Sequence, residues 1–317
     1  MIIQSLLVIF GFVCLIFGAN WLVDGASSLA KKHNISDLAI GLTIVAFGTS
    51  APELVVNIIG SINGYSDIVL GNIIGSNNFN LFIILGISGL ILPITVQSST
   101  AWKEIPISLM AAIILLFFIN DFNFVEPSYL SRLDSLVMLV LFLMFLYYVF
   151  RQMKNDSIIQ ADFVQKSTLK IWGLILFGLS GLVIGGQLVV VNSVNIANSL
   201  GVSEKIIGLT IVAAGTSLPE LVTSIVAATK RNSDIAIGNV IGSNIFNILL
   251  ILSISGLISP IEYNPKFNLD FYILIGGTIF LLIFMLTGKR KRLDRWESGI
   301  LLGFYLLYTT YLVMKEV

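Results

Sequence analysis

The sequence predicts an all-α, polytopic membrane protein with ten transmembrane helices arranged as two inverted five-helix repeats. Three observations support this fold class: an apolar composition, ten separate apolar segments and a long internal repeat. Hydrophobic residues make up 56% of the 317-residue chain and charged residues only 11%. Soluble domains usually carry about 25% charged residues, so this chain has too few to cover a water-exposed surface. Its formal net charge of zero also disfavours nucleic-acid binding.

Ten segments are long and apolar enough to cross a bilayer, which takes about 20 residues per helix. They are predicted at 2–28, 36–60, 67–92, 102–120, 132–150, 169–198, 204–228, 235–260, 269–287 and 296–315. Their connections are too short for a soluble catalytic or regulatory domain. We therefore expect a first five-helix repeat at 1–150, a cytoplasmic linker at 151–168 and a second five-helix repeat at 169–317.

The distribution of Lys and Arg predicts the orientation, because these residues concentrate in cytoplasmic connections. With the N-terminus outside, 14 of the 18 basic residues lie in or beside cytoplasmic connections, and only four lie outside. We therefore expect a multi-pass protein of the cell membrane with both termini on the extracytoplasmic side.

The internal repeat is the most specific signal in the sequence. Residues 41–94 and 208–261 align without a gap at an offset of 167 residues, and 34 of 54 positions are identical. The matches include polar residues and prolines, which solubility in lipid would not require. Because each half holds five predicted spans, an odd number, the second half enters the membrane from the opposite side. Inverted repeats with Gly- and Pro-interrupted segments are typical of secondary transporters with a site near the midplane.

Glu53 and Glu220 are the two acids that lie well inside apolar segments, at equivalent positions of the repeat. A charged residue at a helix centre costs about 3 kcal/mol on insertion scales, and no Lys or Arg lies in the matching zone. Two protonated glutamates joining helices would be the structural alternative. Symmetry-related acids suit a cation site better.

The residues around each glutamate add further oxygen ligands. Pro52 and Pro219 interrupt helical hydrogen bonding, and irregular backbone at membrane depth is tolerated where it lines a cavity. Hydroxyls that precede each glutamate by four and three residues can share its helix face. These hydroxyls belong to Thr49, Ser50, Thr216 and Ser217.

Polar residues also recur in the helix that follows each glutamate. We expect Ser76, Asn80, Ser243 and Asn247 to be ligands, and the neighbouring glycines to serve helix packing. Asn72 and Asn239 fit a ligand or a packing role equally well. Asp67 and Asp234 each follow a Ser at a segment start, so we interpret them as helix N-cap or first-turn acids.

Carboxylate, amide, hydroxyl and carbonyl oxygens form a ligand set for hard cations, and Ca²⁺ accepts six to eight such oxygens at flexible geometry. The two carboxylates carry a formal charge of −2, which one Ca²⁺ or two Na⁺ would neutralise. A zinc site or a Ser-His relay is disfavoured, because the chain has one cysteine, Cys14, and one histidine, His33.

These motifs resemble those of the sodium/calcium exchanger family. GTSAPE (Gly48–Glu53) and GTSLPE (Gly215–Glu220) look like its signature, and GNIIGSNNFN (Gly71–Asn80) and GNVIGSNIFN (Gly238–Asn247) complete two α-repeats. The resemblance implies ten spans in two inverted halves. It also implies a ligand set made of Ala46 and Ala213 carbonyls with side chains of Thr49, Ser50, Glu53, Ser76, Asn80, Thr216, Ser217, Glu220, Ser243 and Asn247.

The resemblance implies an antiporter that moves Na⁺ inward and Ca²⁺ outward by alternating access. Some relatives carry an aspartate at the position of Asn247, where an acid supports potassium binding, so this chain looks K⁺-independent. We expect segments 2–28 and 169–198 to move against the core. The alternatives are an H⁺/Ca²⁺ antiporter and, from a different class, a cation channel. We expect no enzymatic activity, no cofactor and no obligate protein partner; the partners are Ca²⁺, Na⁺ and the bilayer.

Overall fold

The computed structural model describes residues 2–97, 100–120, 128–153, 166–200, 213–285 and 291–316. Within these ranges the fold is all-α, apart from four strands of two residues each. Seven helices are long and apolar enough to cross a membrane, or eight when one bent pair is taken as a single span. The chain is therefore a multi-pass helical membrane protein. Parts of three predicted segments lie outside the described ranges, namely 204–212, 154–165 and 286–287.

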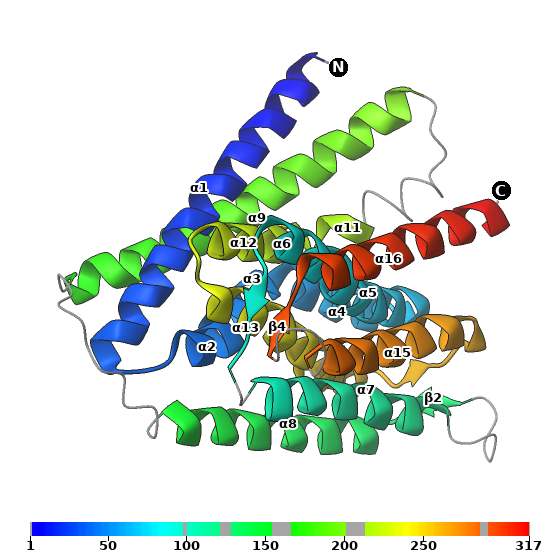
Figure 1. Ribbon diagram of the computed structural model, residues 1–317. Helices are drawn as coiled ribbons and strands as arrows, with labels where there is room; N and C mark the ends of the chain where they lie inside the picture. Colours follow the sequence, from blue (N-terminus) through cyan, green and yellow to red (C-terminus); the bar gives the residue numbers. More distant parts are fainter. Residues whose placement is uncertain are drawn as a thin grey trace.

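The helices α1 (Ile2–His33) and α9 (Thr168–Ser199) pack against each other along their length and lie beside the remaining helices (Figure 1). Glycines at the crossing allow the two backbones to touch. A Cβ atom on Gly18 would lie 2.8 Å from the carbonyl oxygen of Gly178, and one on Gly178 would lie 2.7 Å from the backbone nitrogen of Leu22. Small residues permit this close approach in membranes, where no hydrophobic effect drives helices together.

Two broken segments hold the glutamates predicted as ligands. The first consists of α2 (Asp37–Ile40), the π-helical turn η1 (Gly41–Val45), α3 (Ala46–Thr49) and α4 (Ala51–Ile62). It bends by 49° at Ser50, because Pro52 has no N–H to continue the helix and instead occupies the first turn of α4. The second segment is described from α11 (Ala213–Gly215) through α12 (Leu218–Thr229), and Pro219 likewise lies in the first turn of α12.

Two more segments complete the core, and each contains a π-helical turn. They comprise α5 (Ser66–Asn78), η2 (Phe79–Ile84) and α6 (Leu85–Ile91), and α13 (Ser233–Phe246), η6 (Asn247–Ile251) and α14 (Leu252–Ile258). In the most apolar 18-residue stretch of the span Ser233–Ile258, 94% of the residues are buried, whereas in the corresponding stretch of α1 only 22% are buried. The second of these segments is therefore the centre of the molecule, and α1 lies at its edge.

The remaining helices pack around this core, with α7 and α8 along one side and α15 and α16 along another (Figure 1). They are η3 (Thr100–Glu104), α7 (Ile105–Asn120), α8 (Arg132–Met153), η7 (Pro265–Phe267), α15 (Asn268–Phe284) and α16 (Arg295–Glu316). Two short antiparallel pairings join the ends of segments from the two halves. They are β1 (Ile94–Thr95) with β4 (Arg292–Leu293), and β2 (Tyr129–Leu130) with β3 (Ile261–Glu262).

Candidate ion-binding site

Glu53 and Glu220 occupy the first turns of α4 and α12, directly after the two helix breaks, and each is only 1% exposed. The unpaired N–H groups of a helix start, together with the helix dipole, favour a negative charge there. The helix breaks thus place a compensating partial positive charge beside each buried acid.

Each glutamate is bonded by the serine of the other half of the chain. Ser50 Oγ donates a 2.9 Å hydrogen bond to Glu220 Oε1, and Ser217 Oγ donates a 3.2 Å hydrogen bond to Glu53 Oε1. The spacing of residues predicts that each serine can share a helix face with the glutamate three positions later in its own half. The crossed bonds show that Ser50 and Glu53 both contact residues of the other half.

The threonines of the two motifs also reach across this interface. Thr49 Oγ1 lies 3.0 Å from Asn239 Oδ1, and Thr216 Oγ1 lies 3.3 Å from Asn72 Oδ1. Asn239 in turn donates to the backbone carbonyl of Glu220 at 3.2 Å. In this structure Asn72 and Asn239 therefore hold the threonine hydroxyls.

The structure brings Ser243 into the same cluster, since Ser50 Oγ lies 3.0 Å from Ser243 Oγ. The carbonyl of Ala46 accepts hydrogen bonds from Ser50 N at 3.0 Å and from Thr49 Oγ1 at 3.3 Å. Ala213 is the first residue of α11, at the corresponding position of the second half.

Five buried oxygen atoms of the predicted ligands have no hydrogen-bond partner in the part of the chain that the structure describes. They are Glu53 Oε2, Glu220 Oε2, Ser76 Oγ, Asn80 Oδ1 and Asn247 Oδ1. Buried polar atoms are normally satisfied, and each unsatisfied one costs about 1–3 kcal/mol. Each of the five can act as a cation ligand through a lone pair. This set has the chemistry of a hard-cation site.

The carboxylate content of the site is low. Among the described residues, no group of three or more His, Cys, Asp or Glu side chains is arranged to hold a metal ion. Glu53 and Glu220 therefore supply the charge, and neutral oxygens supply the rest. This composition favours ions that are exchanged over a metal that is permanently held.

The sequence did not predict the contacts of two further asparagines, Asn77 and Asn244, although they match at the repeat offset. Both are buried, and each bonds to the helix of the other half. It also missed Asn57, whose Nδ2 donates a 2.7 Å hydrogen bond to the carbonyl of Glu53. Matched polar residues in a repeat were the signal available for the asparagine pair.

Asp67 and Asp234 lie in the first turns of α5 and α13, as the sequence predicted. Asp67 pairs with Lys266 Nζ at 2.5 Å, and both side chains are about half exposed. Asp234 Oδ2 accepts a 2.6 Å hydrogen bond from Gln97. Neither acid is part of the central cluster.

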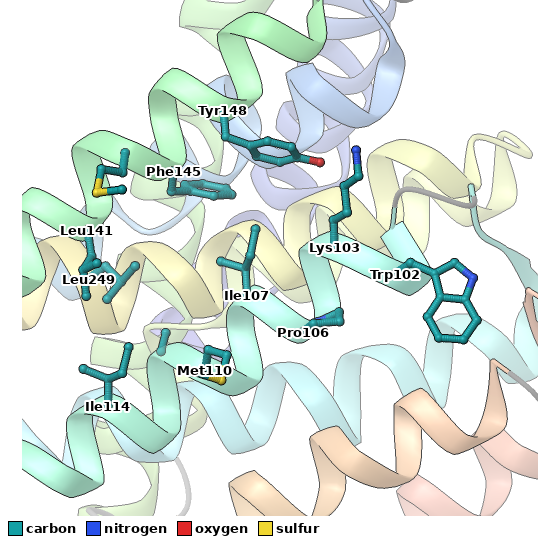
Figure 2. A pocket seen from close by; sticks show the side chains of 12 residues that line it. Trp102, Lys103, Pro106, Ile107, Met110, Ile114, Leu141, Phe145, Tyr148 and Leu249 are labelled. Carbon is teal, nitrogen blue, oxygen red and sulfur yellow. The ribbon is translucent and has the colours of Figure 1, made fainter.

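A groove of about 470 Å³ lies on the outer surface between α7 and α8 (Figure 2). Its lining is almost wholly apolar, with Lys103 and Tyr148 at one end and Ile114 and Leu249 at the other. Trp102, Met110 and Met144 on its rim are more than half exposed. An apolar groove with one charged side chain does not suit a metal cation, so the buried cluster between the halves is the candidate ion site.

Comparison with known proteins agrees with the chemistry of this cluster. The family model described as "Sodium/calcium exchanger protein" matches residues 3–151 and 170–314. The chain belongs to the sodium/calcium exchanger family. Sodium/calcium exchanger MaX1 of Methanosarcina acetivorans is 33% identical, over 98% of this chain and 98% of the relative. Inner membrane protein YrbG of Escherichia coli is 32% identical, over 95% of this chain and 94% of the relative.

A solved structure of the sodium-calcium exchanger NCX_Mj, soaked with zero Na⁺ and Ca²⁺, matches the fold of this exchanger-family chain. The TM-score is 0.84 at 32% identity, over 98% of this chain and 100% of the other. Family and structural relatives of this chain are thus transporters. The matched residues include both glutamate motifs and both asparagine-rich helices.

Proposed function

We propose that this chain is an antiporter that exchanges Na⁺ for Ca²⁺ by alternating access, and that it works without K⁺. One observation carries this proposal: crossed serine hydrogen bonds join two buried carboxylates of different halves, and each carboxylate keeps one oxygen without a partner among the described residues. The pair has a formal charge of −2, so one Ca²⁺ or two Na⁺ neutralises it. Because Ca²⁺ and Na⁺ compete for the same oxygens, the site carries one kind of ion at a time, and this alternation gives antiport.

The proposed ligands are the carboxylates of Glu53 and Glu220, with hydroxyl, amide and carbonyl oxygens around them. Those further ligands are Ala46, Thr49, Ser50, Ser76, Asn80, Ala213, Thr216, Ser217, Ser243 and Asn247. K⁺-independence rests on Asn247, a neutral amide where an acid would add a third negative charge. Two carboxylates balance Ca²⁺ or two Na⁺ and leave no charge for a further ion.

We also propose ten spans in two inverted repeats, bounded at 1–150 and 169–317, with both termini extracytoplasmic. Two strand pairings support this topology. Residues Ile94 and Leu293 pair, and so do Leu130 and Ile261. The ten-span arrangement puts the members of each pair on the same side of the membrane, as pairing requires.

Alternating access needs an element that covers the site and moves, and α1 with α9 fits this role. Two side chains of α9, Leu179 and Val190, pack closely against the glycines of the two glutamate motifs. A Cβ atom on Gly48 would lie 2.3 Å from Leu179 Cδ2, and one on Gly215 would lie 2.3 Å from Val190 Cγ2. A shift of α9 along its axis would change the contacts at both helix breaks together.

The second candidate is an H⁺/Ca²⁺ antiporter. It is favoured by one observation: Oε2 of each glutamate has no partner, so each carboxylate can accept a proton instead of Na⁺. Uptake of radiolabelled Ca²⁺ into proteoliposomes under separate Na⁺, K⁺ and pH gradients distinguishes the two. Uptake driven by Na⁺ alone is the expected result. Uptake driven by a pH gradient without Na⁺ would select the proton antiporter, and downhill flux without a counter-ion would select a channel.

A further inference from the structure

The centre of the molecule contains a hydrogen-bonded cluster of four buried asparagines, the asparagine cluster, contributed by α5 with η2 and by α13 with η6. Its members are Asn77, Asn80, Asn244 and Asn247, each at most 2% exposed. Only Asn80 and Asn247 belong to the proposed ligand set. The other two have no assigned role, although they lie at the contact between the halves.

Asn77 and Asn244 bond to each other's backbone. Asn77 Nδ2 donates to the carbonyl of Asn244 at 3.3 Å, and Asn244 Nδ2 donates to the carbonyl of Asn77 at 3.3 Å. Both carbonyls lie just before the π-helical turns η2 and η6, where helical hydrogen bonding changes its register.

These reciprocal bonds determine which way each amide faces. An amide nitrogen and oxygen have similar shapes, so the hydrogen-bond network decides their placement. A backbone carbonyl only accepts, so the group that Asn77 turns toward Asn244 must be its NH₂. Asn77 Oδ1 therefore faces the opposite way, and the same holds for Asn244 Oδ1.

The two remaining oxygens then fix the amides of the proposed ligands. Asn77 Oδ1 accepts from Asn247 Nδ2 at 2.9 Å, and Asn244 Oδ1 accepts from Asn80 Nδ2 at 3.0 Å. Since both NH₂ groups are held, Oδ1 of Asn80 and Oδ1 of Asn247 are the atoms left without a partner. A flipped amide would present two N–H donors to a cation and repel it.

We propose that Asn77 and Asn244 are positioning residues that orient the Asn247 and Asn80 amides, so that oxygen and not NH₂ faces the transported ion. This inference rests on the proposed function, because it concerns the same site. Neither positioning residue needs to touch the ion. Substituting residues that orient metal ligands typically costs 10- to 100-fold in metal affinity.

The test is a double-mutant cycle on the Ca²⁺ KM, measured by radiolabelled uptake into proteoliposomes that contain the full chain. We expect Asn77→Leu to raise the KM about 10- to 100-fold, because the Asn247 amide can then flip. An aspartate at 247 has oxygens at both positions and needs no orientation. In an Asn247→Asp background, Asn77→Leu should therefore change the KM by about twofold or less.

Asn78→Leu is the matched control. Asn78 is a buried asparagine on the same helix. Its Nδ2 donates to the carbonyl of Asp270, which is not part of the asparagine cluster. This variant should leave the Ca²⁺ KM within about twofold of wild type even if it lowers thermal stability. The reciprocal cycle compares Asn244→Leu with and without Asn80→Asp, and it tests whether Asn244 orients the Asn80 amide. It replaces the first cycle if Asn77→Leu does not fold.

An unchanged KM in both Asn77→Leu and Asn244→Leu would overturn the proposal. An equal loss with and without the aspartate would also overturn it, because a purely structural defect acts in both backgrounds. Failure of the proposed function would instead be seen in the wild-type protein, which would show no Na⁺-driven Ca²⁺ uptake. The KM values of the variants would then be compared under the gradient that does drive uptake.

Discussion

Ser50 and Glu220 are 170 residues apart in sequence, yet their side chains form a 2.9 Å hydrogen bond at the buried centre of the protein. The equivalent pair, Ser217 and Glu53, forms the matching bond at 3.2 Å. Each half of the chain therefore completes the acid site of the other half. A single repeat would leave its glutamate without this hydroxyl partner.

The crossed serine bonds predict a loss of affinity in either serine variant. Ser50→Ala and Ser217→Ala each remove a donor to a carboxylate and a proposed ligand oxygen. We expect the Ca²⁺ KM to rise about 10- to 100-fold in each case. Uptake assays at varied Ca²⁺ measure this, with Thr278→Val as control. Among the described residues, Thr278 Oγ1 donates only to the carbonyl of Leu274, one turn earlier in α15. A wild-type KM in both serine variants would show that these hydroxyls do not contribute.

The contact between α1 and α9 predicts a stability difference between two glycines of the same helix. A Cβ atom on Gly178 would lie 2.7 Å from the backbone nitrogen of Leu22, whereas one on Gly173 would have nothing within 4 Å. Gly178→Ala should therefore destabilise the protein by about 1–3 kcal/mol, through overpacking against backbone. Gly173→Ala should be neutral or slightly stabilising. Thermal unfolding in detergent compares them, and equal melting temperatures would argue against a tight helix contact.

The contact between Gly48 and Leu179 predicts a defect in transport rate. A methyl group on Gly48 would lie 2.3 Å from Leu179 Cδ2, the flexible end of a side chain, so the protein can fold around it. We expect Gly48→Ala to lower the maximal uptake rate about 10-fold, because α9 can no longer pass over the break as it moves. The double variant Gly48→Ala with Leu179→Ala should recover most of the rate. No recovery would mean that the defect arises elsewhere.

The ion pair of Asp67 and Lys266 predicts a small effect. Both side chains are about half exposed, and exposed pairs usually contribute less than about 1 kcal/mol. Asp67→Asn should leave the Ca²⁺ KM within about twofold of wild type, and the melting temperature nearly unchanged. A large rise in KM would instead place Asp67 on the path of the ion.

The sequence indicated candidate site residues but not the contacts between them. Glu53 and Glu220 stood out because acids are rare in apolar segments and because they match at the repeat offset. Helix periodicity indicated that Ser50 and Glu53 can share a helix face, but it did not indicate the bond from Ser50 to Glu220. Periodicity describes one helix and says nothing of its contacts with a distant segment.

Pairing between the halves could not be predicted at all from spacing. The bonds of Asn77 to Asn244 depend on how two distant helices cross, and on π-helical turns that no residue pattern in the sequence indicated. The glycine contact between α1 and α9 was not predicted, because spacing along the chain does not give the register of two distant helices.

The central claim is that Glu53 and Glu220 together bind the exchanged ions. Its most direct test is Na⁺-driven uptake of radiolabelled Ca²⁺ by Glu53→Gln and Glu220→Gln, compared with Glu297→Gln. Glu297 is also fully buried, but its Oε2 accepts the backbone N–H of Asp294 at the start of α16, a role that glutamine can also fill. We predict that both site variants lose uptake by about 100-fold or more, while Glu297→Gln transports at the wild-type rate. Full uptake by either site variant would contradict the claim.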